Sequence, residues 1–166
     1  SVNLTNESLE WDGIEACIEN VVQKYQFPNV QLGLEITEQD ALSSSIDITK
    51  KIEALKAKGH RFLIDDFGMG HTSLVYLQTK YFNIVKLDGS LTRDVIHNET
   101  NRDIIASIVY LGRSLKFKII AEYVENEAQR DELKKLGCDA FQGYLYSKPI
   151  KLDELMSWIK GSGHES

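Results

Sequence analysis

The sequence lacks a long apolar run and a linker, and both absences limit what the chain can be. No apolar stretch approaches the roughly 18 residues that a membrane-spanning helix needs. No segment reads as a linker, so the 166 residues are expected to form one domain with its own core. No signal peptide is visible, and because the chain opens inside an expected strand, we expect it to be cut from something longer.

Cysteine and basic charge are also scarce. Cys17 and Cys138 follow no metal-binding or redox spacing, so we expect reduced thiols in a cytoplasmic protein, with a disulfide as the alternative. The net charge of -6 argues against a nonspecific nucleic-acid binder, because such a protein needs a basic surface to release counterions. A small phosphorylated ligand stays compatible, because metal ions held by carboxylates reverse the local sign of charge.

Short apolar segments alternate with stretches of helical periodicity. We expect strands over residues 2–5, 31–37, 61–65, 84–88, 118–124 and 140–145. We expect helices over residues 9–25, 46–58, 73–78, 101–115, 127–136 and 153–159. In the first helix, the apolar residues at helical spacing are Ile14, Ile18, Val21 and Val22. The domain is expected over residues 1–160, with a flexible tail over 161–166.

This alternation predicts an α/β fold with a parallel sheet and right-handed crossovers. The sheet is either open or part of a barrel. A complete eight-stranded barrel needs about 250 residues, so a barrel built from this chain is about two units short of closure.

Each expected strand places apolar residues on one face and a polar residue near its carboxyl end on the other. These polar residues are Asn3, Glu35, Asp65, Lys86 with Asp88, Glu122 and Gln142. Parallel strands are normally buried on both faces, so the polar groups need each other, water or a metal ion as partners. One interpretation is a structural ion-pair network around Lys86. A metal site is the interpretation we favour, because carboxylates outnumber the one lysine and repel each other when unpaired.

The candidate ligands are oxygen donors, which suit Mg²⁺ or Mn²⁺. No histidine or cysteine falls in the strand-end set, and this disfavours zinc. Asp65 and Asp66 are adjacent, so both reach one site only if the chain leaves the pleat at Asp66, and Gly68 and Gly70 favour such a turn. Two neighbouring metals bridged by a carboxylate suit in-line displacement at phosphorus, which is our hypothesis for the reaction class.

Six segments carry a resemblance to a known family. They are 1–5 (SVNLT), 34–38 (LEITE), 65–70 (DDFGMG), 86–90 (KLDGS), 121–125 (AEYVE) and 142–149 (QGYLYSKP). In this order they resemble the EAL-domain family of cyclic di-GMP phosphodiesterases, and they span nearly the whole chain. The resemblance implies a TIM-like (β/α) barrel, with about six of eight βα units present here, that hydrolyses cyclic di-GMP to linear pGpG with Mg²⁺ or Mn²⁺.

The resemblance also implies roles for individual residues. The implied ligands of the first metal are Asn3, Glu35 and Asp65, and those of the second are Asp65, Asp66 and Glu122. Lys86 would orient the attacking water, and Glu122 is also a candidate general base. Gln142 would complete the polar ring, with Asp88 and Glu125 supporting it. Tyr144 and Tyr146 could stack on guanine or pack at the barrel rim.

Glu38 has two interpretations. The resemblance implies that it pins the loop over residues 67–71, which shapes the second metal site and contributes to dimerisation. From the sequence alone, Glu38 is equally a carboxylate at a helix N-terminus, facing the helix dipole. We expect a homodimer or other self-association, and the full-length protein could carry upstream sensor or GGDEF domains or be membrane-tethered.

Three departures from the family pattern bear on activity. The Glu-Ala-Leu stretch that names the family, whose glutamate is a metal ligand, is absent from the chain, so the first metal's shell is incomplete and turnover is at risk. Met69 stands where threonine is usual and is expected to alter loop docking. Tyr123 stands where glycine is usual, and we expect its ring to point outward and pack on a helix.

Two other functions compete with hydrolysis. One is a degenerate EAL-type domain that binds cyclic di-GMP or a protein partner without cleaving it. The other is a metal-dependent lyase of the enolase kind, suggested by Lys86 and Asp88 near other carboxylates, but it leaves the ordered motifs unexplained. An open barrel would expose strand edges, which also predicts self-association.

Overall fold

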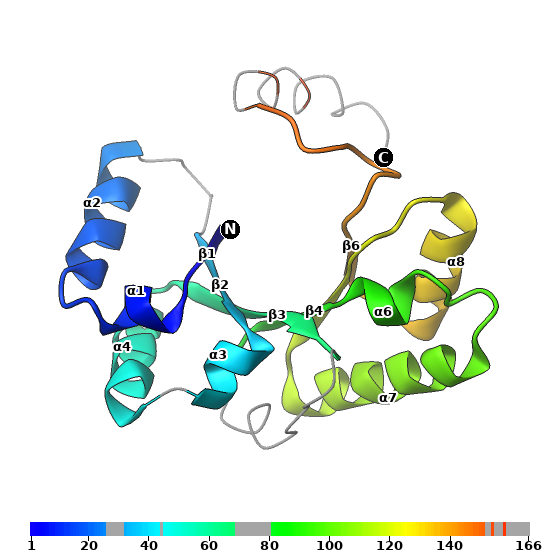
Figure 1. Ribbon diagram of the computed structural model, residues 1–166, viewed down its shortest axis with the longest axis horizontal. Coiled ribbons are helices and arrows are strands. Elements are labelled where there is room, and N and C mark those ends of the chain that lie inside the picture. Colours follow the sequence, from blue (N-terminus) through cyan, green and yellow to red (C-terminus); the bar gives the residue numbers. More distant parts are fainter. Residues whose placement is uncertain (26–31, 44, 69–80, 152–153, 155–157, 159–166) are drawn as a thin grey trace.

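The computed structural model describes residues 1–25, 32–43, 45–68 and 81–151, together with 154 and 158 (Figure 1). The expected helix over 73–78 and the tail over 161–166 lie outside these residues, as does most of the helix expected over 153–159. No described helix is long and apolar enough to cross a membrane.

The strands form one six-stranded sheet in the order β1-β2-β3-β4-β5-β6, and every neighbouring pair is parallel. Their bounds are β1 Val2–Asn3, β2 Gly33–Thr37, β3 Arg61–Phe67, β4 Ile84–Leu87, β5 Lys118–Ala121 and β6 Ala140–Phe141. A sheet whose spatial order equals its chain order is what repeated βα units build in a barrel wall. The expected parallel α/β fold is therefore confirmed.

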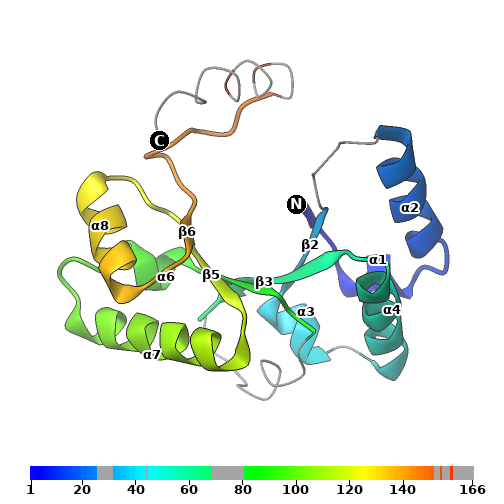
Figure 2. The same ribbon diagram turned by 180° about the vertical axis from the view of Figure 1, so that it is seen from behind.

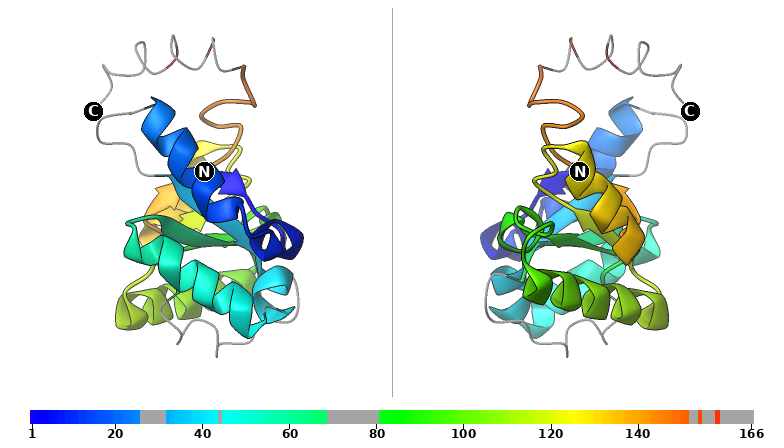
Figure 3. Two further views of the ribbon diagram at one scale, coloured as in Figure 1. Left: turned by 90° about the vertical axis from the view of Figure 1, so that its left-hand side faces the viewer. Right: turned by 90° about the vertical axis from the view of Figure 1, so that its right-hand side faces the viewer.

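Helices follow the strands and cover one side of the sheet. Their bounds are α1 Asn6–Glu10, α2 Ile14–Tyr25, α3 Glu38–Ser43, α4 Ile46–Ala57, α6 Gly89–Thr92, α7 Glu99–Leu115 and α8 Glu127–Leu136. Figures 1 and 2 show α1, α2 and α4 grouped near β1 to β3, and α6, α7 and α8 near β4 to β6. The side views in Figure 3 show α4 and α7 on the same side of the sheet.

The core lies between these helices and the apolar strand face. The strand residues that are at most 1% exposed there are Leu34, Ile36, Phe62, Ile64, Val85, Leu87, Ile119 and Ala121. The helix residues that share this core include Ile48, Ile52 and Leu55 of α4 and Ile105, Ile108 and Val109 of α7. The alternation along the strands thus separates a buried apolar face from the polar face that forms the site.

Several expected elements have different bounds. The helix expected over 9–25 is two helices, because the Thr5 hydroxyl accepts the Ser8 amide proton and starts α1, and the chain then turns between α1 and α2. Of the four apolar residues at helical spacing in α2, Ile14 and Ile18 are buried, whereas Val21 and Val22 are 47% and 41% exposed. The short helices α3 and α6 were not predicted. The first, fifth and sixth strands end earlier than expected, at Asn3, Ala121 and Phe141.

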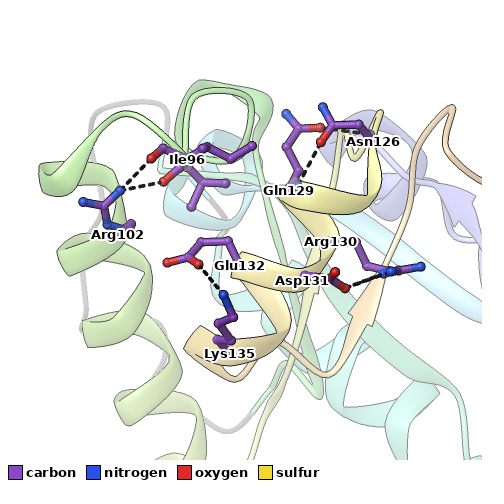
Figure 4. A network of polar contacts seen from close by, with 9 residues as sticks. Ile96, Arg102, Asn126, Gln129, Arg130, Asp131, Glu132 and Lys135 are labelled. Atoms are coloured by element: carbon purple, nitrogen blue, oxygen red, sulfur yellow. Dashed lines mark hydrogen bonds and ion pairs between the residues drawn. The ribbon is translucent and has the colours of Figure 1, made fainter.

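The helices near β5 have well-defined starts (Figure 4). Asn126 caps α8 in a capping box with Gln129. Arg102 of α7 donates to the carbonyls of Val95 and Ile96 at 3.3 and 2.9 Å, which ties the turn after α6 to α7. These contacts fix the segments that carry the β5 side of the site.

Candidate active site

The carboxyl ends of the strands meet in a cavity of about 630 Å³. Its lining residues are Ser1, Asn3, Glu35, Asp65, Asp66, Lys86, Arg93, Glu122, Tyr123, Glu125, Gln142, Gly143 and Tyr144. Every polar strand-end residue singled out in the sequence is in this set except Asp88. The cavity lies where ligands bind in folds of parallel strands.

Lys86 occupies the centre of the polar face. Its Nζ lies 2.9 Å from Oε2 of Glu35, 2.8 Å from Oδ1 of Asp65 and 2.8 Å from Oε1 of Glu122. Lys86 is only 4% exposed, and although burial lowers its pKa, the hydrogen bonds to Asp65, Glu122 and Glu35 outweigh burial and raise it. The lysine is therefore a fixed positive charge, and its ion pairs link β4 to β2, to β3 and to the residue that follows β5.

Asp65 and Asp66 reach the same site although they are adjacent in the chain. Asp66 has a φ of 53°, and the pairing of β3 with β4 shifts register between Ile64 and Phe67. The chain thus leaves the pleat at Asp66, as the sequence required for both carboxylates to converge. Asp65, Asp66 and Glu122 each bring an oxygen within 4.8 Å of the other two.

The crowded carboxylates differ in how readily they ionise. Burial raises the pKa of Glu35, but hydrogen bonds from Ser1 and Lys86 outweigh it, so the net shift is downward. Burial and then the charges of Asp65 and Asp88 raise the pKa of Asp66. Burial also raises the pKa of Glu122, and its bond to Lys86 only partly offsets that effect. Asp66 and Glu122 therefore lack enough positive charge nearby to offset their burial.

The donor set fits a hard divalent cation. Asp65, Asp66 and Glu122 offer only oxygen ligands, and the amides of Asn3 and Gln142 line the same cavity. Mg²⁺ and Mn²⁺ prefer such ligands, and a cation here would offset both the burial and the carboxylate repulsion that raise the pKa of Asp66. The residues present are thus compatible with the metal that the sequence pattern indicates.

The supporting residues have separate places. Oε2 of Glu38 accepts the Gly68 amide at 3.2 Å, and Glu38 is the first residue of α3. Residues 69–71 of the expected loop lie outside the described residues, so its roles in shaping the second metal site and in dimerisation stay predictions. Asp88 caps α6 by accepting the Ser90 amide at 2.7 Å, and it does not line the cavity. Burial raises its pKa, but the hydrogen bonds from Ser90 lower it overall. Glu125 and Gln142 line the cavity.

The segment after β5 differs from expectation. Tyr123 was expected to point outward onto a helix; its ring does approach Gly89 of α6, but it also lines the cavity and lies under the Arg93 guanidinium at 4.1 Å. The reason is its φ of 54°, which breaks the alternation of the strand.

Sequence reasoning missed Thr92, Arg93 and Gln129. The Thr92 hydroxyl donates to the Glu122 carbonyl at 2.6 Å, and the Gln129 amide donates to the Arg93 carbonyl at 2.8 Å. A signal was present, because Asp88 followed by Gly89 and Ser90 is a helix start, and one helical turn carries Thr92 and Arg93 toward β5.

Comparison with known proteins gives consistent results. The family model "EAL domain" matches residues 1–149. The chain is 34% identical over 159 residues to the bifunctional diguanylate cyclase/cyclic di-GMP phosphodiesterase MucR of Pseudomonas aeruginosa, covering 96% of the chain and 23% of MucR. It is 34% identical over 160 residues to the cyclic di-GMP phosphodiesterase PdeF of Escherichia coli, covering 96% of the chain and 21% of PdeF. The chain therefore spans about a fifth to a quarter of the length of these curated relatives.

Solved structures share the fold. The MucR phosphodiesterase in complex with cyclic di-GMP superposes with a TM-score of 0.83 at 34% identity, covering 93% of this chain and 62% of that one. The EAL domain of DcpA from Mycobacterium smegmatis gives 0.87 at 28% identity, covering 96% and 71%. A manganese and cyclic di-GMP complex of BlrP1 from Klebsiella pneumoniae gives 0.82 at 29% identity, covering 89% and 38%. From the family match, the relatives and the shared TIM-like α/β fold, the chain belongs to the EAL domain family.

Proposed function

We propose that the chain is a metal-dependent phosphodiesterase that hydrolyses cyclic di-GMP to linear pGpG. The observation that carries the proposal is the convergence of Asp65, Asp66 and Glu122 within 4.8 Å, beside a lysine, in the cavity at the strand ends. The relative PdeF is named a cyclic di-GMP phosphodiesterase, and the related structure of BlrP1 is a complex with manganese and the same dinucleotide.

Asp65, Asp66 and Glu122 would hold one Mg²⁺ or Mn²⁺ ion, and Asn3, Glu35 and Asp65 a second. Bound metal would supply charge stabilisation for the phosphate and lower the pKa of an attacking water. Glu122, whose pKa is raised by burial, is suited to accept the proton of that water. Lys86 would orient the water while its ion pairs hold Glu35, Asp65 and Glu122. The water oxygen would bond to phosphorus as the bond from phosphorus to the ribose oxygen breaks; Glu122 would take the proton of the water, and the released ribose oxygen would take up a proton from solvent to become a hydroxyl.

A second candidate function is binding of cyclic di-GMP without cleavage. It is favoured by the three ion pairs of Lys86, which already satisfy Glu35 and Asp65 without a cation. For the whole protein we propose a cytoplasmic signalling role with self-association through this domain and, by analogy with the bifunctional relative, cooperation with a GGDEF-type or sensor domain.

The test is incubation of the chain with cyclic di-GMP and Mg²⁺ or Mn²⁺, with pGpG followed by chromatography. Glu35→Gln removes a proposed ligand with little change of volume, and Glu99→Gln, in the first turn of α7, is the matched control. Product that is lost in Glu35→Gln and kept in Glu99→Gln is the expected result. Binding of the dinucleotide without product would favour the second candidate, and neither binding nor product would reject both.

A further inference from the structure

Tyr123 has an unfavourable backbone conformation. Its φ of 54° lies in the left-handed region, where a residue with a Cβ is disfavoured relative to glycine and a bulky aromatic residue is rare. Among the described residues, only Asp66 and Lys116 share a positive φ without being glycine. Aspartate tolerates this region because its short polar side chain bonds locally, and tyrosine has no such compensation.

Burial does not explain the tyrosine. Its side chain stays 44% exposed, so the ring contributes little to the core. The ring instead lines the cavity and stacks against the Arg93 guanidinium, whose centre lies 4.1 Å from the ring centroid. Backbone strain at the rim of a cavity, without burial to offset it, is typical of a functional position.

The surroundings hold Tyr123 from both sides. Before it, the Glu122 carbonyl accepts the buried Thr92 hydroxyl at 2.6 Å. After it, the Glu125 amide donates to Oε1 of Gln129 at 2.9 Å, and Nε2 of the same Gln129 donates to the Arg93 carbonyl at 2.8 Å. Gln129 is 5% exposed, and Figure 4 shows it at the start of α8. One buried side chain thus fixes the backbones that carry the ring and the guanidinium.

Gly143, two residues after the end of β6, closes the arrangement. A Cβ at Gly143 would collide with the backbone of Val124, so the segment after Tyr123 is packed directly on the chain that follows β6. The aromatic ring and the guanidinium are therefore preorganised and need not be ordered when a ligand arrives.

We propose that Tyr123 and Arg93 form a stacking platform for one guanine base of cyclic di-GMP, an inference that rests on the proposed function. An aromatic ring stacks on any base, and a guanidinium beside it adds donors that suit the O6 and N7 acceptors of guanine. Tyr123 directly follows Glu122, so a base on the platform would lie next to the phosphate that faces the carboxylates. The platform fixes the substrate and takes no part in proton transfer.

Tyr144 does not share these features. It is 59% exposed and lines the same cavity, with Lys148 5.7 Å from its ring centroid, but it has no positive φ and is not clamped by a buried side chain among the described residues. The strain and the clamp distinguish Tyr123 as the positioned aromatic residue.

The test compares Tyr123→Gly, Tyr123→Phe and Arg93→Ala with Tyr110→Ala, which removes a 71% exposed ring from α7 outside the cavity. In the metal-loaded chain, Tyr123→Gly is expected to raise KM for cyclic di-GMP by about 5- to 150-fold, as for loss of one stacked base. Its melting temperature should be equal to or above that of the parent, because glycine relieves the strain. Tyr123→Phe keeps the ring and should recover most of the affinity that Tyr123→Gly loses, and Arg93→Ala should raise KM in the same direction as Tyr123→Gly. The control Tyr110→Ala should stay within threefold of the parent.

A spectroscopic readout separates stacking from a structural role. Tyr123→Trp places an indole on the platform, and a stacked guanine should quench it beyond the change that Trp11 and Trp158 show in the parent. If the parent binds or hydrolyses cyclic di-GMP and Tyr123→Gly leaves KM unchanged, the platform alone is overturned, whether or not the melting temperature falls. A parent that neither binds nor hydrolyses cyclic di-GMP would overturn the proposed function and the platform with it.

Discussion

At the ends of β3 and β5, a carboxylate that faces Lys86 is followed by a residue with a positive φ. Asp66, with a φ of 53°, follows Asp65, and Tyr123, with a φ of 54°, follows Glu122. In β3 the turn lies inside the strand and brings a second carboxylate to the first. In β5 the turn ends the strand and brings an aromatic ring to the rim of the cavity.

The two turns differ in what stabilises them. Aspartate occupies the left-handed region at modest cost, so the β3 turn is compatible with its own side chain. Tyrosine does not, and the β5 turn depends on Thr92 and Gln129, which bind its backbone from α6 and α8. A positive φ at a strand end can thus be favoured by the residue's own side chain or imposed by contacts from neighbouring elements.

The largest effect is expected from the carboxylates that precede the turns. Glu122→Gln removes the proposed base, and kcat for cyclic di-GMP should fall by about 10²- to 10⁴-fold, as for loss of a general base. Glu127→Gln, at the exposed start of α8, is the control and should retain parental turnover. Rates of Glu122→Gln within tenfold of the parent would remove Glu122 from the mechanism.

Two substitutions of Asp66 separate the effect of the backbone conformation in the β3 turn from the effect of the carboxylate charge. Asp66→Asn keeps a side chain that tolerates a positive φ but removes a metal-ligating charge, so turnover should fall by about 10- to 100-fold. Its melting temperature should be equal to or above that of the parent, because burial and the neighbouring carboxylates disfavour the charge that is removed. Asp66→Val should in addition lower the free energy of unfolding by about 1–3 kcal/mol, because a β-branched residue is strained there. Equal stability of the two variants would show that the positive φ is not required.

The β5 turn should be sensitive to a residue outside it. Thr92→Val leaves the buried Glu122 carbonyl without its donor, and the free energy of unfolding should fall by about 1–3 kcal/mol. Thr92→Ser keeps the hydroxyl and should recover most of that loss. Ser107→Ala removes a comparable hydroxyl bond on exposed α7 and should change stability by less than about 0.5 kcal/mol. Chemical denaturation of the three variants decides whether the Thr92 hydroxyl stabilises the β5 turn.

The effect that is smallest near neutral pH concerns Cys138, which lies between α8 and β6 and reports on the β5 side. Burial raises the pKa of its thiol to about 12, with a smaller contribution from Asp139. The folded-state pKa exceeds the unfolded one, so the thiol's contribution is complete below about pH 8.5 and is lost as pH rises toward 12, by up to about 1.4 kcal/mol per pH unit.

Denaturation between pH 8 and pH 10 measures this slope, and Cys138→Ala should flatten it. Cys17→Ala, at an exposed thiol, should leave it unchanged. Thiol titration at pH 8 should likewise modify Cys17 alone in the native chain. Rapid modification of Cys138 would contradict a well-packed β5 side.

The sequence was sufficient where the signal is local and periodic. Alternation along the strands placed Glu35, Lys86 and Glu122 on one face, and the order of strands and helices indicated the parallel sheet. The need for a departure from the pleat at Asp66 also followed from the adjacency of Asp65 and Asp66, and the structure has it.

The rest depends on contacts that periodicity does not contain. The strand over 118–124 was expected to continue through Tyr123, but contacts from Thr92, Gln129 and Gly143 turn the chain there. The helix over 9–25 was expected from periodic apolar residues that all lie in α2, and only the Thr5 cap marks the separate, earlier start of α1. Side-chain contacts between distant segments, such as Thr92 with Glu122, have no sequence period to reveal them.

Mn²⁺ binding followed by electron paramagnetic resonance tests most directly whether the ends of β3 and β5 form one metal site. The parent chain should bind Mn²⁺, and both Asp65→Asn and Glu122→Gln should weaken that binding, because the two residues share the site from different strands. The control Glu127→Gln should bind as the parent does. Binding that is unchanged in either of the two site variants would contradict a shared site and with it the proposed metal-dependent hydrolysis.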